Sequence, residues 1–306
     1  MFTKIEPALA LSLSDRLALE AALVFERVQD TDPGEDTFFD NEGGFVEELK
    51  LTWTGEDYGL FAGKYNAPFG MAWGLAPGMW GVDFAEDYET TEKIGFGGHV
   101  DFAPGETGAY TITAGTYFAD TTFLSESVIT HRGGLEKSDG GASNTQDLSS
   151  FALAFDGMAT AGVAGLRTHA AYRHQAAGDA DAGAENEHSY ALGANYEFPI
   201  SARLQGSALG EGVLIHNADG GVDDVDYLTA GFTLVIDGAW NAAVSWTGRN
   251  TDAGGGAADI DDDLFQLTAG YAFANGVQVD AGYRFTDEAG SDKHIVGTRL
   301  VYSLSF

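Results

Sequence analysis

The segment KHIVGTRLVYSLSF, residues 293–306, decides how the rest of the chain is interpreted. One parity of this segment is mainly apolar and consists of Val296, Thr298, Leu300, Tyr302, Leu304 and Phe306. The other parity is mostly small or polar and includes Gly297, Arg299, Ser303 and Ser305. Because successive side chains of a strand point to opposite faces, the segment predicts a strand with one apolar face and one wet face.

The same alternation recurs along most of the chain. It predicts further strands at residues 9–13, 17–25, 45–53, 58–69, 94–102, 110–118, 151–155, 166–175, 190–198, 203–216, 228–236, 240–246, 265–273 and 277–285. We leave the parity of residues 203–216 open and expect a bulge there. Connections alternate between short turns, such as Asn275-Gly276, and long polar loops. Strands of about 9–12 residues joined in this way are typical of a membrane-spanning β-barrel.

Aromatic side chains support the barrel over a soluble all-β fold. Many lie beside the short turns on the apolar parity: Trp53, Tyr58, Phe102, Tyr110, Phe155, Phe198, Trp240, Phe273 and Phe306. Rings of Trp, Tyr and Phe at one level favour a bilayer interface. The sequence therefore predicts a single all-β domain over residues 1–306, a transmembrane antiparallel up-and-down barrel.

An aromatic final residue on an amphipathic strand resembles the closing strand of Gram-negative outer-membrane β-barrels. The segments GKYNAPFG (63–70) and DYETTEKIG (87–95) also resemble phosphate-selective and siderophore-type porins. The resemblance implies the outer membrane as location, outer-membrane lipid and lipopolysaccharide as surroundings, and a homotrimer as assembly. The chain departs from phosphate-selective porins because it lacks their dense ladder of arginine and lysine.

Composition excludes several other classes of function. The 306 residues contain no cysteine, so thiolate chemistry and disulfides are absent. The formal net charge of −32 argues against nucleic acid as a partner. A mean hydropathy of −0.11 is compatible with a membrane barrel, since half of each strand faces a wet lumen.

The number of predicted strands is fifteen, whereas bacterial single-chain barrels have even numbers. Either residues 1–13 are not a full strand, which gives 14, or one upstream strand is missing, which gives the 16 that we expect for the native protein. Residues 1–16 do not have the pattern of a signal peptide, because the apolar stretch is short and contains Glu6 and Pro7. We therefore expect the numbering to begin inside the native precursor.

Charged and histidine side chains on the lumen parity are the candidate pore lining. They are Lys50, Lys64, His99, Asp101, Arg167, His169, Arg173, Arg249, Arg284 and Arg299. Residues 71–93 are the candidate constriction loop, and their candidate carboxylates are Asp83, Glu86, Asp87 and Glu89. Loop carboxylates that face basic wall residues would create a transverse field across the pore. The alternative is that these acids are simply solvated, or are bridged to lipopolysaccharide by divalent cations.

We expect no defined metal site and no cofactor. The acidic segments DTDPGED, NADGGVDDVD and ADIDDD lack the full pattern of a calcium-binding loop. Loose binding of divalent cations at acidic loops is the expected form of metal contact. No serine has the sequence context of a hydrolase nucleophile, so we expect no enzymatic activity.

The sequence hypothesis is a porin, a passive diffusion channel for small hydrophilic solutes or ions. One alternative is a porin selective for an oxyanion or a siderophore. Another is a closed barrel that acts as an adhesin or an outer-membrane hydrolase. The sequence leaves charge selectivity open, because it depends on where the 71–93 loop lies.

Overall fold

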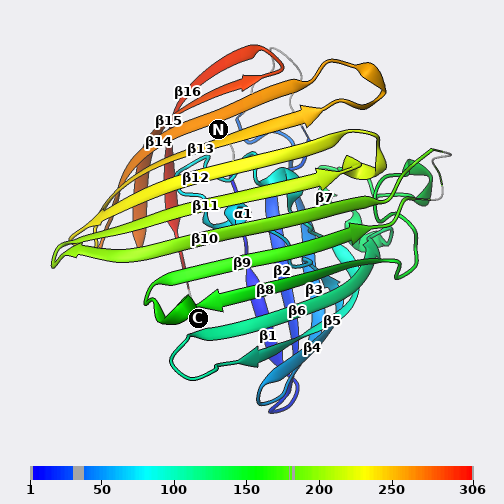
Figure 1. The fold of residues 1–306 in the computed structure, drawn as a ribbon, viewed down its shortest axis with the longest axis horizontal. Helices are drawn as coiled ribbons and strands as arrows, with labels where there is room; N and C mark the ends of the chain where they lie inside the picture. The colour runs from blue at the N-terminus through cyan, green and yellow to red at the C-terminus, as the bar shows by residue number, and fades with distance from the viewer. Residues whose placement is uncertain (1–2, 30–37, 179, 181–182, 305–306) are drawn as a thin grey trace.

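The computed structural model describes residues 3–29, 38–178, 180 and 183–304. Nearly all regular structure is β (Figure 1). The strands are β1 (Ala8–Ser12), β2 (Leu17–Arg27), β3 (Glu42–Thr54), β4 (Tyr58–Tyr65), β5 (Lys93–Phe102), β6 (Ala109–Ala119), β7 (Val128–Ile129), β8 (Ser150–Met158), β9 (Leu166–Gln175), β10 (Glu187–Ser201), β11 (Leu204–His216), β12 (Asp224–Ile236), β13 (Trp240–Asp252), β14 (Ile260–Ala272), β15 (Val277–Glu288) and β16 (Ser291–Tyr302).

All sixteen strands belong to one antiparallel sheet in which sequence neighbours are spatial neighbours. The exception is β7, which leaves this path and pairs with Gly43 and Gly44 of β3. The predicted fold class, an all-β up-and-down arrangement, is confirmed. The sixteenth strand of the sheet, β7, lies inside the loop between β6 and β8. The upstream wall strand that we expect in the native protein lies outside this sequence and stays a prediction.

The sheet curls strongly, but β1 and β16 do not pair (Figure 1). In the described residues β1 pairs with β2 alone and β16 with β15 alone. An even number of antiparallel steps separates the two edge strands, so they run in the same direction. The predicted closure of the barrel is therefore not seen. Phe306, which we expected to end the closing strand, lies outside the described residues.

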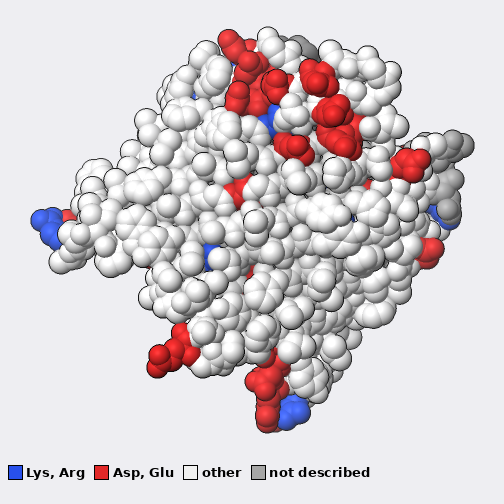
Figure 2. Space-filling model, viewed as in Figure 1, with Lys and Arg blue, Asp and Glu red and all other residues white. Residues whose placement is uncertain are grey.

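The wall is apolar outside and polar inside, the reverse of a soluble protein. Outward residues such as Leu192 and Val296 are 70% and 83% exposed. Inward residues such as Gln266 and Thr247 are fully buried under the loops and side chains that fill the interior. Figure 2 shows this wall as mostly uncharged, with acidic side chains gathered over β13 to β16.

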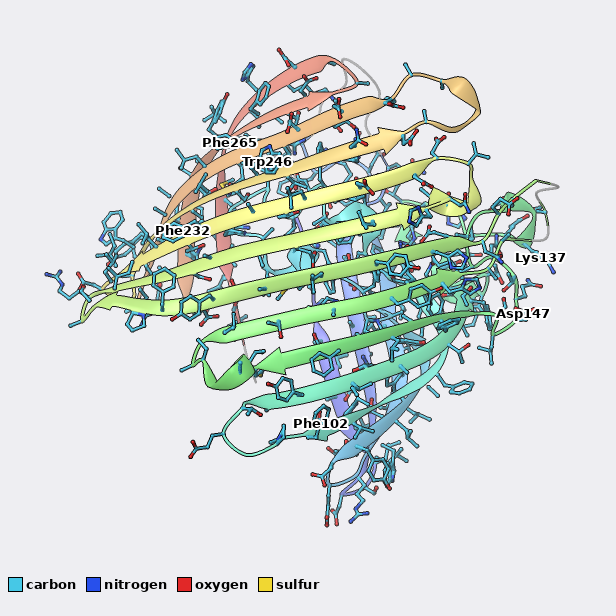
Figure 3. The ribbon with its side chains drawn as sticks, in the orientation of Figure 1. Phe102, Lys137, Asp147, Phe232, Trp246 and Phe265 are labelled. Atoms are coloured by element: carbon cyan, nitrogen blue, oxygen red, sulfur yellow. The ribbon has the colours of Figure 1, made fainter. Side chains whose placement is uncertain are left out.

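Outward aromatic side chains form contacts along the short-turn end of the wall. Trp53 contacts Tyr58 at a centroid distance of 5.2 Å, and Tyr110 contacts Phe155 at 5.5 Å. Figure 3 shows Phe102 near this end, whereas Lys137 and Asp147 lie at the long-loop end. The clustering predicted from the sequence is thus present, and an apolar band with aromatic ends is what a bilayer requires.

Two bulges correct the predicted parities. Glu47 is an extra residue in β3, because Ala22 pairs with Glu48 and Leu23 with Val46. Phe45 therefore faces inward, although its sequence parity placed it with Leu49. The second bulge is at Ile200 in β10, whereas we expected one within residues 203–216. Both are single-residue insertions that reverse the facing of the residues beyond them.

The strand predicted to reach residue 69 ends at Tyr65, and residues 66–92 form one long connection to β5. This connection contains a single helical turn, α1 (Ala72–Leu75), and the 3-10 turn Glu86–Tyr88. It runs inside the curl of the sheet, where α1 is seen behind β10 and β11 (Figure 1). Within the described residues no helix has the length and apolar character to cross a membrane.

Candidate functional site

The connection between β4 and β5, residues 66–92, is the central feature of the interior, and we call it the lumen loop. Its buried side chains Phe69, Ala72 and Tyr88 pack against inward residues of β10 to β12, such as Val213 and Tyr227. The rings of Tyr88 and Tyr227 meet edge-on at 5.0 Å. The predicted constriction loop is therefore packed onto the inner face of the wall, although its last residue, Lys93, belongs to β5.

Glu211 of β11 is the anchor of the first half of the lumen loop. Its carboxylate accepts hydrogen bonds from the backbone N–H groups of Met71 (2.6 Å) and Ala72 (2.9 Å). It also accepts one from the hydroxyl of Tyr88 at 2.6 Å. Glu211 is 2% exposed, so these three donors replace the water that its charge would otherwise need.

Two predicted lining residues of β9 hold the ends of the lumen loop. His169 Nε2 accepts from the backbone N–H of Gly70 at 3.0 Å, and its Nδ1 lies 2.8 Å from Asp156 Oδ1. The guanidinium of Arg173 donates to the Tyr88 carbonyl (2.8 Å), to Thr90 Oγ1 (2.6 Å) and to Glu187 (2.7 Å). Both side chains therefore fix the loop and are buried rather than open to the pore.

The middle of the lumen loop fits against small or amide-bearing positions of β14 to β16. Gln266 Nε2 donates to the carbonyl of Pro77 at 2.6 Å. The indole of Trp80 lies over two inward glycines, since a Cβ at Gly282 or Gly297 would come within 3.1 or 3.0 Å of it. Small residues at these wall positions thus make room for a loop of bulky side chains.

The loop carboxylates Asp83 and Asp87 are paired directly with wall arginines. Arg284 Nη1 contacts Asp83 Oδ2, and Arg249 Nη1 donates to Asp87 Oδ2 at 2.7 Å. Arg249 also binds Asp262 at 2.6 Å. The two loop aspartates and the two wall arginines are in direct contact and do not face each other across open space. Their contribution to a transverse field is therefore largely cancelled.

Glu86 and Glu89 lie on the opposite side of the lumen loop, among acids of the N-terminal part of the chain. Glu86 interacts with Glu26 and Lys4, and Glu89 with Glu47. Lys4 is already 3.2 Å from Glu6 and 3.6 Å from Glu26. The carboxylates in this region therefore outnumber the cations.

Three carboxyl groups of the lumen loop, those of Asp83, Glu86 and Glu89, have raised pKa values. Desolvation raises the pKa of Glu89 to about 7, and the charges of Glu47 and Glu86 add to this effect. Desolvation likewise raises the pKa of Glu86. It also raises the pKa of Asp83 to about 6, although Arg284 acts in the opposite direction. Protonation of Glu89 and Asp83 near neutral pH would change the charge of the interior.

The remaining predicted lining residues lie apart from the lumen loop. On β3, Lys50 is paired with Glu48 at 2.9 Å; on β5, His99 lies 3.7 Å from Asp101. Near the short turns, Arg167 lies 3.6 Å from Glu197, and Arg299 lies 2.9 Å from the buried Asp280. The sequence prediction therefore combined residues that hold the loop with residues that line other parts of the wall.

Lys64 of β4 is fully buried under the long-loop end. Its ammonium lies 2.7 Å from Glu92 and 2.8 Å from Asp120, and it donates to the Leu124 carbonyl at 2.8 Å. It therefore ties β4, the end of the lumen loop and the loop after β6 together rather than contacting solutes.

Replacing Lys64 with methionine is expected to lower the free energy of unfolding by about 3–5 kcal/mol, since the buried carboxylate of Asp120 loses its cation. The matched control is Lys50→Met, whose partly exposed pair with Glu48 is expected to be worth about 0–1 kcal/mol. Urea titration of both refolded variants in detergent measures the difference. Equal stabilities of the two variants would show that Lys64 does not hold the loops.

Sequence reasoning missed Glu211 and Lys93. Glu211 lies in the segment whose parity was left open, and a lone acid between glycines gave no sign of three partners. Lys93 was assigned to the loop, although it has the same parity as His99 of the following strand and faces inward with it. Extending the strand back by one residue, from Ile94 to Lys93, with the same inward parity, could have identified it.

No family model matches the sequence, and no curated protein does. Solved structures do match. The outer membrane channel DcaP of Acinetobacter baumannii is similar with a TM-score of 0.59 and 12% identity over 97% of this chain and 82% of that one. OccK1 (OpdK) of Pseudomonas aeruginosa gives 0.56 and 10% over 99% and 81%. A loop-deletion mutant of OmpT, an outer membrane protein of Vibrio cholerae, gives 0.55 and 14% over 96% and 89%.

At these identities the likeness establishes the fold alone. It is the fold of outer-membrane β-barrels, in agreement with the inverted polarity of the wall and the aromatic contacts at its short-turn end. The predicted location, the outer membrane of a Gram-negative bacterium, agrees with each neighbour named here.

Proposed function

We propose that the chain is an outer-membrane channel for small hydrophilic solutes, narrowed by the lumen loop. The observation that carries this proposal is the loop itself. Its contacts fix it to strands between β9 and β16, whereas Glu86 and Glu89 lie on the side of β2 and β3. A polar interior divided in this way restricts passage by size without blocking it.

The proposed channel favours cations. The wall arginines Arg249 and Arg284 are paired with loop aspartates. Lys4 is the cation whose charge acts on Glu86, Glu89 and Glu26 among the described residues. A narrow passage with uncompensated carboxylates concentrates cations and repels anions. The structure therefore favours the loop acids over the wall arginines as the groups that govern passage.

Liposome swelling tests the proposed channel. Purified protein in vesicles is expected to admit arabinose and glucose faster than a trisaccharide such as raffinose. Cationic solutes should enter faster than anionic ones of equal size. Equal swelling rates with and without folded protein would contradict a channel.

Acidification is expected to reduce cation preference. Below pH 7 Glu89 becomes protonated and loses its negative charge. Below pH 6 Asp83 is also neutralised, which exposes the positive charge of Arg284. Both changes act in the same direction, so the cation-to-anion permeability ratio should fall from pH 8 to pH 5. A ratio that stays constant over this range would exclude these carboxylates as the selective groups.

We propose no covalent chemistry for this chain. The buried histidine–aspartate pair, His169 with Asp156, uses its second ring nitrogen to accept from the Gly70 backbone. That nitrogen is therefore occupied by the loop and does not activate a serine. We also propose a homotrimer, since one solved structure of similar fold is the trimer form of in-vitro folded OmpT (TM-score 0.50, 14% identity). Light scattering of the protein in detergent measures its assembly.

A further inference from the structure

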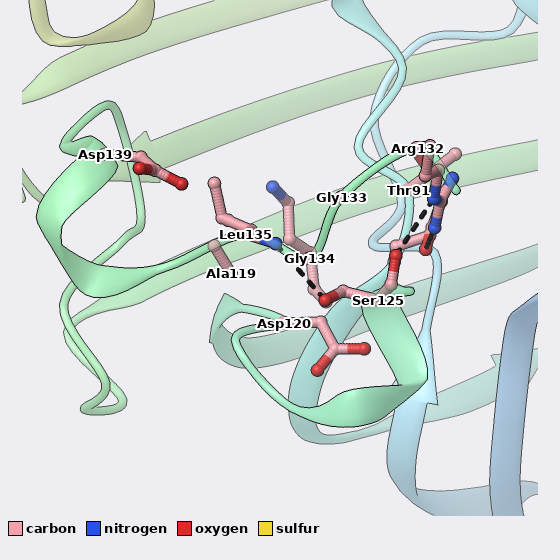
Figure 4. A pocket seen from close by; sticks show the side chains of 11 residues that line it. Thr91, Ala119, Asp120, Ser125, Arg132, Gly133, Gly134, Leu135 and Asp139 are labelled. Carbon is pink, nitrogen blue, oxygen red and sulfur yellow. Dashed lines mark hydrogen bonds and ion pairs between the residues drawn. The ribbon is translucent and has the colours of Figure 1, made fainter. Parts of the chain in front are cut away.

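A cavity of about 400 Å³ lies at the long-loop end, where β5 begins and β6 ends. The loop after β6 forms its other walls (Figure 4). Its lining includes the charged side chains Glu92, Lys93, Asp120, Arg132 and Asp139. The volume falls in the range of pockets that hold small organic molecules.

Most charges of this cavity are compensated within the protein. Arg132 makes a bidentate pair with Glu92, with distances of 2.9 and 2.5 Å. Lys64 lies between Glu92 and Asp120 beneath the cavity. These contacts form a closed network of two cations and two carboxylates.

Lys93 is the cation outside this network, and the charges of Glu187, Asp219 and Glu92 act on it from beyond ion-pair distance. It stands on the inward face of β5, and its ammonium has a hydrogen bond to Ser143 Oγ at 3.3 Å. In the part of the chain that the structure describes, no carboxylate lies within 4.0 Å of it. An ammonium group has three donors, so Lys93 can still donate to a molecule in the cavity.

Asp139 is the carboxylate left over. It closes a 3-10 turn (Lys137–Asp139) in which its side chain accepts from the backbone N–H of Glu136 at 2.8 Å. This contact fixes the direction of the side chain, and Figure 4 shows its carboxylate extending from the loop toward Leu135. Its charge has no cationic partner among the described residues.

We propose that this cavity binds a small zwitterion with the chemistry of an amino acid. The carboxylate of such a molecule would accept from Lys93, and its ammonium would donate to Asp139. Each end meets the opposite charge, whereas a simple amine or a simple carboxylate would satisfy one end only. The proposal goes beyond the channel function, because binding here does not require conduction.

Calorimetric titration of the folded protein in detergent tests the site. The probes are glycine, β-alanine, 4-aminobutanoate and 6-aminohexanoate, with butylamine and butanoate as compounds of single charge. At least one zwitterion is expected to bind about tenfold more tightly than both single-charge compounds, because it forms a second charge-assisted hydrogen bond. Lys93→Gln and Asp139→Asn should each reduce its affinity about tenfold.

Lys293→Gln and Asp292→Asn on β16 are the matched controls and should leave affinity unchanged. Far-UV circular dichroism and heat-modifiable mobility on gels verify that each variant is folded. The proposal is overturned if no zwitterion binds to folded wild-type protein. Binding of butanoate as tight as that of every zwitterion, with no effect of Asp139→Asn, would overturn it as well. Titration in the absence of a membrane keeps this result independent of whether the channel conducts.

Discussion

Replacing Glu86 and Glu89 together with glutamine is expected to lower the cation-to-anion permeability ratio by about tenfold, which is the effect of removing two nearby charges from a weakly screened passage. The two carboxylates lie on the side of the lumen loop toward β2 and β3, where Lys4 is the cation whose charge acts on both among the described residues. Glutamine keeps the size and polarity of the side chains. The change therefore isolates their charge.

The reversal potential of single channels under a salt gradient measures this ratio. The control is Glu56→Gln with Glu106→Gln, an equal charge change at the short turns. This control should leave the ratio near that of the wild type. If both double variants behaved alike, selectivity would depend on net charge rather than on the lumen loop.

Replacing Glu211 with alanine is expected to release the lumen loop from the wall. Three hydrogen bonds to one buried carboxylate are lost, and the donors on Met71, Ala72 and Tyr88 are left without an acceptor. Each bond to a charged group contributes about 1.5–3 kcal/mol, so the loop loses most of its attachment to β11. Single-channel conductance should rise, current noise should increase, and raffinose should enter liposomes.

Glu197→Ala on the neighbouring strand β10 is the control for this variant. Glu197 is exposed and lies 3.6 Å from Arg167. Neither residue belongs to the lumen loop. Its conductance should match that of the wild type. Unchanged conductance and size exclusion in a folded Glu211→Ala variant would show that the loop does not limit the pore.

The strands and their facing were largely predictable, because alternation is a local property. The short turn at Asn275-Gly276 lies where the sequence placed it, between β14 and β15, and it supplies the small and polar residues that tight turns require. The errors occurred where a single extra residue reversed the facing, as at Glu47 and Ile200. No local signal marks such an insertion.

The candidate site was predictable only as a set of charges. Arg249 and Arg284 were identified as inward residues, but their partners Asp87 and Asp83 are 162 and 201 positions away along the chain. Pattern analysis assigns a side chain to a face and says nothing of which loop will cover it. That these charges form direct ion pairs, and do not face each other across the pore, could therefore be learned only from the structure.

Closure is the other point at which sequence and structure differ. The sequence predicted an odd number of wall strands, and the structure has the same fifteen on its continuous path, with β7 set apart. An odd set leaves two edge strands that run in the same direction and cannot pair as antiparallel neighbours. From the odd number we inferred a closed barrel of 14 or 16 strands, whereas the described sheet has open edges at β1 and β16.

Single-channel recording of the refolded protein in a planar bilayer, with different salt concentrations on the two sides, tests the central claim most directly. Steady ohmic steps with a reversal potential of the sign expected for cations would agree with a channel governed by Glu86 and Glu89. Folded protein that inserts but carries no current, or a reversal potential of the anionic sign, would contradict it.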